Sequence, residues 1–494
     1  MKRERLFGWT CAVLAALVQA HAAMSWGHLM WLAPVLWGLA AMVASRSPAP
    51  RRLALAMGAV QGVVASAHLW GVYFYAPSVY AVVIGYHLVL WAAFTLLAAW
   101  VLARAPRVAP LALGAAWAFL ESVRGLGALS FPFYFGGMLA EATWIAQAAS
   151  VVGASGLSGL VFAAGFAVAG LVADRLGEPR WGARAAWAPP LALVALTALG
   201  GGLRLALAPA STPTLRVVAL QGAVPQWLYS LGTGTGPFRR VIEEHYGALY
   251  RRALAGPVKP DLVLFPETAF DWHVQATTEG IRRIGPLGAT RLPARTSVVV
   301  GASFAGRHQA DSQNGVAFLQ PGEGGLPVLT EATSKRRLVP FIEAGHRPGA
   351  RWATGRAAGR QLFVLICYES MYAEAAVAAR EEGAELLAVL SDDAGMRWSP
   401  MAWTHAEQAK LRAIEAGLPL VRAGQFGPSY AVDAYGRVLA TLGHGATGLV
   451  AADLPAARPP TLYSRIGRWW VIVWAGLFLA GVLAPVRVRA GGAR

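Results

Sequence analysis

The chain has 494 residues, of which 56% are hydrophobic and only 14% are charged. An ordinary soluble domain carries about a quarter charged residues, so this composition argues against a wholly water-soluble protein. The net charge of +17 is typical either of nucleic-acid binding or of the basic loops that orient a membrane protein. Two cysteines, Cys11 and Cys367, are too few for a disulfide framework.

Apolar runs occupy the first 210 residues, and each is close to the roughly 20 residues that a helix needs to cross a bilayer. The predicted spans are 7–24, 26–45, 53–74, 79–103, 108–124, 147–172 and 186–208, with an eighth at 466–486. Between them, short β-rich runs and regular turn signals indicate an aqueous domain. The sequence therefore predicts a seven-helix membrane domain over 1–210, a folded domain over 212–460 and a C-terminal membrane helix over 465–488.

Basic residues cluster in alternate connections between these spans. They are Lys2, Arg3 and Arg5; Arg46, Arg51 and Arg52; Arg104 and Arg107; Arg175, Arg180 and Arg184; and Arg487, Arg489 and Arg494. The positive-inside rule then predicts that both termini are cytoplasmic and that 212–460 lies outside. The basic start and the sequence AHA before Met24 also resemble a cleavable signal peptide, which leaves the orientation of the later loops unchanged.

Four polar residues interrupt the apolar runs: His68, His87, Glu121 and Arg124. A charge at mid-bilayer costs about 2.5–3.5 kcal/mol, so these groups could form a relay or a lipid headgroup site. The alternative, which we favour, is interfacial placement with an ion pair between Glu121 and Arg124. The segment 125–137 is expected to be an interfacial loop that faces the aqueous domain.

Four apolar runs in the aqueous domain end in polar residues: 216–222, 261–267, 362–369 and 385–393. Buried strands with a reactive residue just beyond their carboxyl ends are how layered α/β enzymes assemble a site. Helical patterns lie between them, notably at 238–255 and 404–416. We therefore expect an α/β sandwich with its site at one edge of the sheet.

Three residues in this domain have the chemistry of acyl transfer through a thioester. Glu267 follows an apolar strand, Lys335 is a rare lysine in an arginine-rich chain, and Cys367 is the domain's one cysteine. Taken singly, they could be a surface cap, a solvated cation and a core thiol. Together they supply a base, a cation that a developing oxyanion requires, and a nucleophile.

At this point the sequence resembles a known family, the bacterial apolipoprotein N-acyltransferases. The motifs are VALQGAVPQ (218–226), LFPE (264–267), SKRRLVPFIE (334–343), ICYE (366–369), Pro400, His405, RAIE (412–415) and PLVRA (419–423). The resemblance implies a membrane enzyme of the nitrilase superfamily, with an α-β-β-α sandwich inserted before the last of about eight membrane helices. It also implies an inner-membrane location, no cofactor or metal, and no nucleic-acid partner.

The resemblance assigns roles to individual residues. Glu267 would be the general base, Lys335 the oxyanion-stabilising cation, Cys367 the nucleophile and Glu343 a supporting carboxylate. An acyl chain would pass from a membrane phospholipid to Cys367, and then to the α-amino group of a lipoprotein's diacylglyceryl-cysteine. The expected substrate-binding residues are Tyr368, Glu369, Phe341, Trp398 and His405, and the backbone N–H of Tyr368 is a candidate second oxyanion donor. We expect a monomer.

Aromatic residues near these motifs could line a lipid entrance or belong to the core. They are Trp227, Phe341, Trp352, Trp398 and Trp403.

The sequence departs from the family at 391–400, where SDDAGMRWSP replaces an Asn-Asp-Ala-Trp-aromatic-Gly pattern. AGQFGPS at 423–429 replaces an Asn-containing loop, and the segment between Lys335 and Cys367 is short. These changes leave two alternatives open. One is a membrane-anchored amidohydrolase or an acyltransferase with another amine acceptor, and the other is a non-catalytic membrane scaffold.

Overall fold

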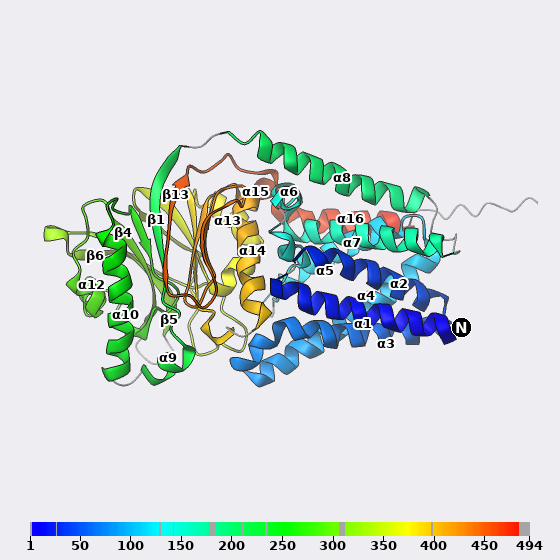
Figure 1. The fold of residues 1–494 in the computed structure, drawn as a ribbon, viewed down its shortest axis with the longest axis horizontal. Helices are drawn as coiled ribbons and strands as arrows, with labels where there is room; N and C mark the ends of the chain where they lie inside the picture. Colours follow the sequence, from blue (N-terminus) through cyan, green and yellow to red (C-terminus); the bar gives the residue numbers. More distant parts are fainter. Residues whose placement is uncertain are drawn as a thin grey trace, which may run out of the picture.

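The structure is a computed structural model with two parts, a helical bundle and an α/β domain stacked against one end of it (Figure 1). It describes residues 2–25, 27–127, 130–141, 143–176, 184–209, 212–232, 236–305, 312–396 and 399–483. The N-terminus lies at the end of the bundle that is remote from the α/β domain.

The bundle contains a helix at each predicted span. The helices are α1 (Lys2–Ser25), α2 (Leu32–Arg46), α3 (Pro50–Ala65), α4 (Pro77–Arg104), α5 (Ala109–Arg124), α6 (Thr143–Ala146), α7 (Ala149–Arg175), α8 (Arg184–Ala206), α15 (Leu462–Ile466) and α16 (Trp470–Leu483). Short 3-10 helices are η1 (Gly27–Trp31), η2 (Ser66–Phe74), η3 (Phe135–Leu139) and η8 (Gly467–Trp469). Within the described residues, six helical segments are long and apolar enough to cross a membrane. Helices α1 and α5 are not among them: α5 has 16 residues and α1 begins in a charged sequence.

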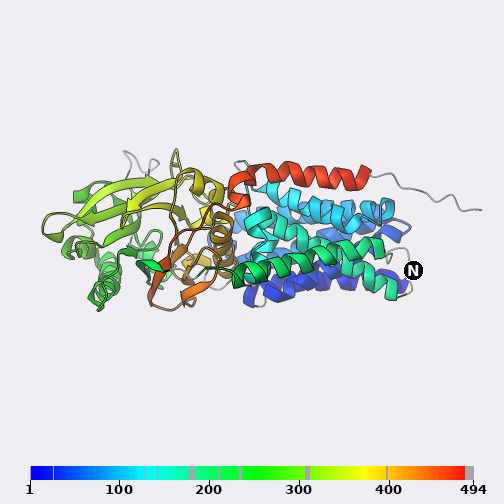
Figure 2. The ribbon, with the colours of Figure 1, turned by 90° about the horizontal axis from the view of Figure 1, so that it is seen from above.

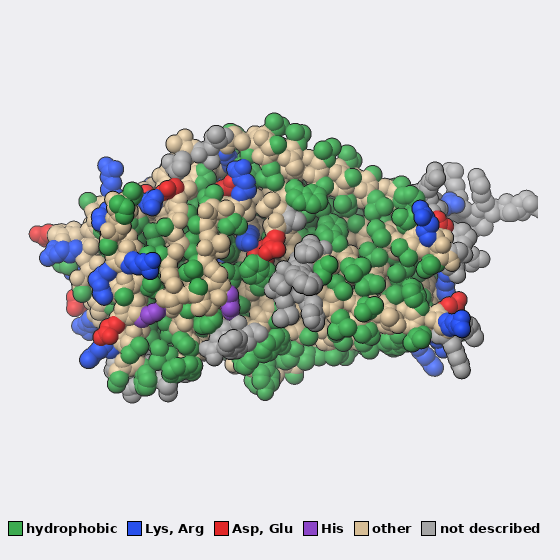
Figure 3. All heavy atoms as spheres, viewed as in Figure 1, with side chains coloured by type: hydrophobic (Ala, Val, Ile, Leu, Met, Phe, Trp, Pro, Cys, Tyr) green, Lys and Arg blue, Asp and Glu red, His purple; other side chains and the backbone are tan. Residues whose placement is uncertain are grey.

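On the face of the bundle seen in Figure 3 the surface is broadly hydrophobic. Its exposed side chains include Leu14, Val89, Trp100, Leu199 and Leu477. Charged side chains gather instead on the α/β domain and at the opposite end of the bundle. Exposed apolar surface of this extent is stable in lipid rather than in water, and the protein is a membrane protein.

The basic ends of α2, α4 and α7 lie on one side, whereas α5 and α8 end in Arg124 and Arg204 on the side of the α/β domain. Because α4 and α7 run away from the α/β domain, Arg104 and Arg175 lie at the remote end of the bundle, as does the start of α1 (Figures 1 and 2). Arg46 at the end of α2 lies there too. The predicted alternation of basic connections thus corresponds to one face of the bundle.

The α/β domain consists of two sheets. In the described residues the first sheet has the order β13-β1-β2-β4-β5-β6, with β3 paired to β4, and the second has the order β12-β11-β10-β9-β8-β7. The first contains β1 (Pro213–Gln221), β2 (Leu262–Leu264), β3 (Phe270–Val274), β4 (Ser297–Phe304), β5 (Gln313–Pro321), β6 (Pro327–Ser334) and β13 (Gly448–Pro455). The second contains β7 (Ala353–Ala357), β8 (Arg360–Ile366), β9 (Leu386–Ser391), β10 (Leu420–Gly424), β11 (Ser429–Val432) and β12 (Val438–Leu442).

Alternation along the strands places one set of side chains between the sheets. On β1, Val217 and Ala219 lie in the core between the sheets, whereas Val218 and Leu220 pack under the outer helices. Those helices are α9 (Gln226–Gly232), α10 (Gly236–Ala255), α11 (Thr278–Arg282) and α12 (Gly285–Ala289). A strand buried on both faces is apolar throughout, as the sequence of this run is.

Helices α13 (Glu374–Glu381) and α14 (Pro400–Ala416) cover the other face of the second sheet and separate it from the bundle (Figure 1). The α-β-β-α sandwich and the helical membrane domain are therefore confirmed. Phe363 and Val389 of the sheet belong to one continuous hydrophobic core with Trp37 and Phe162 of the bundle. The two parts thus form a single packed unit.

The loop predicted to face the aqueous domain contacts it. The Tyr368 hydroxyl donates to the Ser130 carbonyl over 2.8 Å, and the backbone N–H of Tyr134 donates to Gln408 Oε1 over 3.0 Å. Glu121 and Arg124 form the expected ion pair at 3.7 Å. Its environment differs from the prediction, because Glu121 is buried inside the protein, where Trp117 Nε1 and the Phe135 N–H also donate to it.

Helices α3 and α4 approach closely at Gly62, where an added Cβ would lie 2.4 Å from the carbonyl oxygen of His87. We expect Gly62→Leu to destabilise the bundle by about 1–3 kcal/mol, the usual cost of overpacking. Gly85 on α4 is the matched control, since a Cβ there meets nothing within 4 Å. Thermal unfolding in detergent should show a lower midpoint for Gly62→Leu only; equal midpoints would contradict the close packing.

Candidate active site

Strand ends from both sheets bring the predicted residues to one place. Glu267 follows β2 and Lys335 follows β6 of the first sheet, while Cys367 follows β8 of the second. Because β2 runs parallel to β1 and β4, and β8 runs parallel to β9, reactive residues collect at the carboxyl ends of the strands. All three side chains line one cavity of about 440 Å³.

Lys335 is the most enclosed of them. Its ammonium is 1% exposed and lies 3.0 Å from Glu267 Oε1 and 3.0 Å from Glu343 Oε1. Burial by itself lowers the pKa of Lys335, but the two carboxylates outweigh burial and raise that pKa well above its usual value. Burial likewise opposes ionisation of Glu343, and Lys335 with hydrogen-bond donors lowers the pKa of Glu343. The lysine is therefore a fixed positive charge.

Sequence reasoning missed two residues that hold the base. Asn314 on β5 donates from Nδ2 to Glu267 Oε1 at 2.7 Å and to Glu343 Oε1 at 2.9 Å. The backbone N–H of Asp392 donates to Glu267 Oε2 over 2.8 Å. Both carboxylate oxygens of Glu267 are thus occupied and its orientation is fixed. The sequence signal for Asn314 is weak, because it is one of three side-chain amides in its strand, QNGVAFLQP, and has no spacing relation to Glu267.

Cys367 adopts a backbone conformation that is unusual for a residue with a side chain, with φ at +52°. Strained residues of this kind occur at sites where the fold aims a reactive group. Burial and the negative charge of Glu267 raise the pKa of the Cys367 thiol well above its usual value, while Lys335 works in the opposite direction. The resting thiol is therefore neutral and needs a base to become a nucleophile.

Glu369 does not have the predicted substrate-binding position. It is fully buried, and it accepts hydrogen bonds from the backbone N–H groups of Ile366, Arg336 and Arg337 at 2.8, 2.8 and 3.0 Å. Burial raises its pKa to about 7, against the effect of these donors. Because its side chain is fully buried and does not line the cavity, Glu369 instead connects the turn at Cys367 to the segment after Lys335.

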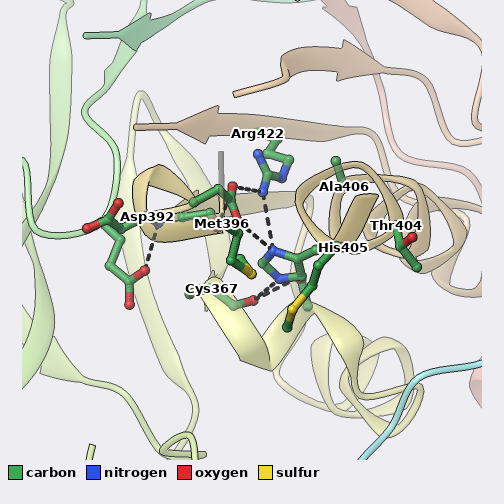
Figure 4. A network of polar contacts seen from close by, with 12 residues as sticks. Cys367, Asp392, Met396, Thr404, His405, Ala406 and Arg422 are labelled. Atoms are coloured by element: carbon green, nitrogen blue, oxygen red, sulfur yellow. Dashed lines mark hydrogen bonds and ion pairs between the residues drawn. The ribbon is translucent and has the colours of Figure 1, made fainter. Parts of the chain in front are cut away.

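His405 lines the catalytic cavity, as predicted for a substrate-binding residue, and its ring nitrogens also contact neighbouring protein groups (Figure 4). Its Nδ1 lies 2.9 Å from Asp393 Oδ1, and its Nε2 lies 3.0 Å from the carbonyl oxygen of Cys367. Arg422 pairs with Asp393 Oδ2 at 2.5 Å. Burial opposes ionisation of Asp393, but Arg422 and His405 hold the pKa of that carboxyl below its usual value. The Ser370 hydroxyl also lies 3.1 Å from His405 Nε2.

The membrane domain supplies the other side of the cavity. Val72, Val79, Val82 and Val83 line it together with Phe131. From the α/β domain, Phe341 and Tyr368 also line the cavity, as predicted for substrate-binding residues. The catalytic groups therefore open onto an apolar space between the two parts of the molecule.

The remaining predicted aromatic residues have mixed outcomes. Trp352 is 7% exposed and packs on Phe363 in the core, so it is not part of a lipid entrance. Trp227 is 55% exposed and Trp403 half-buried, and neither lines the cavity. Trp398 lies outside the described residues. Among the described residues, no group of three or more His, Cys, Asp or Glu side chains could hold a metal ion.

Comparison with known proteins identifies the family. The profile of the apolipoprotein N-acyltransferase N-terminal domain matches residues 11–167, and that of the carbon-nitrogen hydrolases matches residues 246–459. The apolipoprotein N-acyltransferase of Bradyrhizobium diazoefficiens is 31% identical over 77% of this chain and 73% of its own length. The chain belongs to the apolipoprotein N-acyltransferase family.

Two further similar proteins are a second relative and a solved structure. The apolipoprotein N-acyltransferase of Pseudomonas syringae pv. tomato is 26% identical over 80% of each chain. A carbon-nitrogen hydrolase structure from Helicobacter pylori is 16% identical, covers 53% of this chain and 94% of its own, and superimposes with a TM-score of 0.38.

In this protein, Asp392 and Met396 of the altered segment 391–400 line the catalytic cavity. Asp392, which replaces the family's asparagine, presents its backbone N–H to Glu267. Its side chain accepts from the Ala394 N–H at 3.0 Å and from Thr268 Oγ1 at 3.4 Å. The substitution is therefore compatible with a correctly held base.

The charges around Cys367 predict a change in its titration. In Glu267→Gln the carboxylate that raises the thiol pKa is gone while Lys335 remains, so the thiol pKa should fall. Alkylation by iodoacetamide, followed at the Cys367 peptide by mass spectrometry, should reach half of its maximal rate at a lower pH than in the wild type. Enzyme acylation should be lost in the same variant. A midpoint at equal or higher pH would contradict the assigned electrostatics.

The contact of His405 with the Cys367 carbonyl predicts a positioning role. We expect His405→Ala to slow acylation on the order of a hundredfold, the typical effect of a small misplacement of a reacting group, with little change in KM. His405→Gln retains a side-chain donor and should recover part of the rate. Parallel thermal unfolding separates this effect from instability. Equal acylation rates in His405→Ala and His405→Gln would exclude this positioning role.

Proposed function

We propose that the protein transfers an acyl chain from a membrane phospholipid, through a thioester on Cys367, to the α-amino group of a lipoprotein's diacylglyceryl-cysteine. One observation carries this proposal: the base, cation and thiol open onto a cavity whose other side consists of apolar residues of η2 and α4. A phospholipid tail can enter such a cavity from the bilayer, whereas a site for a small soluble amide has no need of it. Membership in the N-acyltransferase family supports the same reaction.

In the first half-reaction Glu267 accepts the thiol proton and the Cys367 sulfur attacks the ester carbonyl of the phospholipid. Lys335 is placed to stabilise the oxyanion of the tetrahedral intermediate, a contribution of about 3–4 kcal/mol for one well-placed donor. Collapse of the intermediate breaks the ester bond. The lysophospholipid leaves with the proton from Glu267, and the acyl chain remains on sulfur as a thioester.

In the second half-reaction the amino group of the diacylated lipoprotein attacks the thioester carbonyl. Glu267 accepts a proton from the nitrogen, Lys335 again faces the oxyanion, and the sulfur leaves and regains a proton. The product is an amide and the free thiol is restored. Because the cavity is largely apolar, water is a poor competitor for the thioester, which favours transfer over hydrolysis.

The division of labour follows the predicted domains. Residues 1–210 and 465–488 hold the enzyme in the membrane, and 212–460 carries the reacting groups. The basic ends of α2, α4 and α7 lie at the end of the bundle remote from the α/β domain, and by the positive-inside rule this supports an α/β domain outside the cytoplasm with both termini inside. A bacterial inner membrane, with the catalytic domain in the periplasm, agrees with this orientation. One copy of the chain contains Glu267, Lys335 and Cys367 in a single cavity, which supports a monomer.

The test is incubation of the purified protein with phosphatidylethanolamine and a synthetic diacylated lipopeptide. The wild type should give a mass increase of one acyl chain on Cys367, followed by N-acylated lipopeptide. Cys367→Ala should give neither product, and Cys11→Ala, in a buried membrane helix, should give both. Hydrolysis of simple amides without lipopeptide acylation would favour the amidohydrolase alternative, and activity in Cys367→Ala would exclude the thioester.

A further inference from the structure

A second cavity of about 810 Å³ lies in the membrane domain, away from the catalytic residues. Helix α16 packs against α5, and α8 packs against α7, so α8 and α16 stand apart along the bundle (Figure 2). The cavity lies between them and is lined mainly by apolar residues of α5, α7, α8 and α16, among them Leu111, Val151, Leu193 and Leu477. We call it the α8/α16 groove.

The groove has the length of a lipid tail. Along α8 it extends from Leu193 to Arg204, which is about 16 Å at 1.5 Å per residue. Half of the hydrocarbon core of a bilayer is about 15 Å thick. Most of the α8 and α16 surface is exposed rather than packed against protein, so both helices face lipid. An acyl chain from one leaflet therefore matches the groove in length and in polarity.

Arg204 lies at the end of the groove nearest the α/β domain. Its Nη1 donates to Gln147 Oε1 over 2.8 Å, and Gln147 in turn donates to the carbonyl of Tyr435 over 2.9 Å. The Arg204 guanidinium is 5.1 Å from the centre of the Tyr435 ring. The cation is thus held at the junction of the bundle and the α/β domain.

Two further guanidinium groups surround the same ring. Arg437 is 5.3 Å and Arg458 is 5.7 Å from its centre. Arg437 pairs with Asp433 at 2.6 Å. The hydrogen bonds of Arg204 and Arg458 go instead to an amide and a backbone carbonyl, and among described residues no carboxylate pairs with either. Like charges this close repel one another, so a bound anion would stabilise the cluster.

We propose that the α8/α16 groove binds a phospholipid with an anionic headgroup, whose phosphate lies at Arg204 and Arg458 and whose acyl chain lies along α8. This lipid is distinct from the acyl donor, because the groove shares no lining residue with the catalytic cavity. It contacts α8, α16 and the Tyr435 loop of the α/β domain together. The bound lipid therefore links the peripheral helices to the catalytic domain.

Two glycines on α8 give a matched pair of variants. A Cβ at Gly200 or at Gly202 meets no atom within 4 Å, so a larger side chain fits at either position. Gly200 lines the groove and Gly202 does not. Gly200→Leu therefore places bulk where the acyl chain would lie, and Gly202→Leu is its control. Arg204→Gln removes the cation, and Arg465→Gln, at an exposed arginine of α15, is the corresponding charge control.

Native mass spectrometry of the full-length protein, titrated with phosphatidylglycerol or phosphatidylethanolamine, measures lipid binding directly. We expect the wild type to prefer phosphatidylglycerol at one site. Arg204→Gln should weaken that binding about fivefold, the usual contribution of one cation near an anionic lipid surface. Gly200→Leu should lose the site, whereas Gly202→Leu and Arg465→Gln should bind as the wild type does.

Several results of these binding measurements would overturn the proposal. They are equal binding of the two lipids by the wild type, unchanged phosphatidylglycerol binding in both Gly200→Leu and Arg204→Gln, and equal losses in the variants and their controls. Displacement of phosphatidylglycerol by inorganic phosphate alone would also contradict it, since the apolar groove would then contribute nothing. Because the readout is binding, it stands apart from the acyl-transfer assay.

Discussion

The ammonium of Lys335, held between two carboxylates and almost completely buried, is the interaction on which the site depends. A buried charge is tolerated only when it is paired and its hydrogen bonds are satisfied, and removing one partner of such a pair costs about 3–5 kcal/mol. Asn314 contributes the remaining donor between the two carboxylates. The network therefore keeps the base and the cation in one geometry and leaves the thiol of Cys367 neutral until Glu267 accepts its proton.

This network needs both sheets and the membrane bundle at once. Glu267 and Lys335 belong to one sheet, and Cys367 to the other, so their distances are set by the apolar core between the sheets. On the far side, the core under α13 and α14 continues into the bundle. Gly153 has a φ of +70° inside α7, and the N–H that follows, that of Ala154, donates to Glu415 of α14 over 2.7 Å. The catalytic cavity is lined both by residues of the membrane bundle and by the reacting residues of the α/β domain.

Much of the site was predictable because its chemistry is carried by rare residue types. A single cysteine and a rare lysine in the α/β domain stand out in the sequence, and the cysteine follows an apolar strand. Glu369 was predicted as a substrate contact, but its side chain is fully buried and accepts backbone hydrogen bonds, whereas His405 both lines the cavity and contacts the Cys367 carbonyl. Closeness to Cys367 in the sequence does not show whether a side chain lines the catalytic cavity or instead accepts hydrogen bonds from the backbone beside the Cys367 turn. Asn314 and the Asp392 N–H were missed for the complementary reason, since they meet Glu267 only through strand pairing.

By itself, the sequence determined the apolar helices, their basic ends, the order of the domains and the strands that end in Glu267 and Cys367. Those properties depend on composition and on local periodicity, which hydrophobic burial converts directly into helices and strands. The tertiary structure alone decided which groups face one another. It pairs Lys335 with two carboxylates and brings His405 to the Cys367 carbonyl. It also gathers Arg204, Arg437 and Arg458 around the ring of Tyr435. These contacts join residues far apart in the chain, and their distances follow from how the sheets and helices pack.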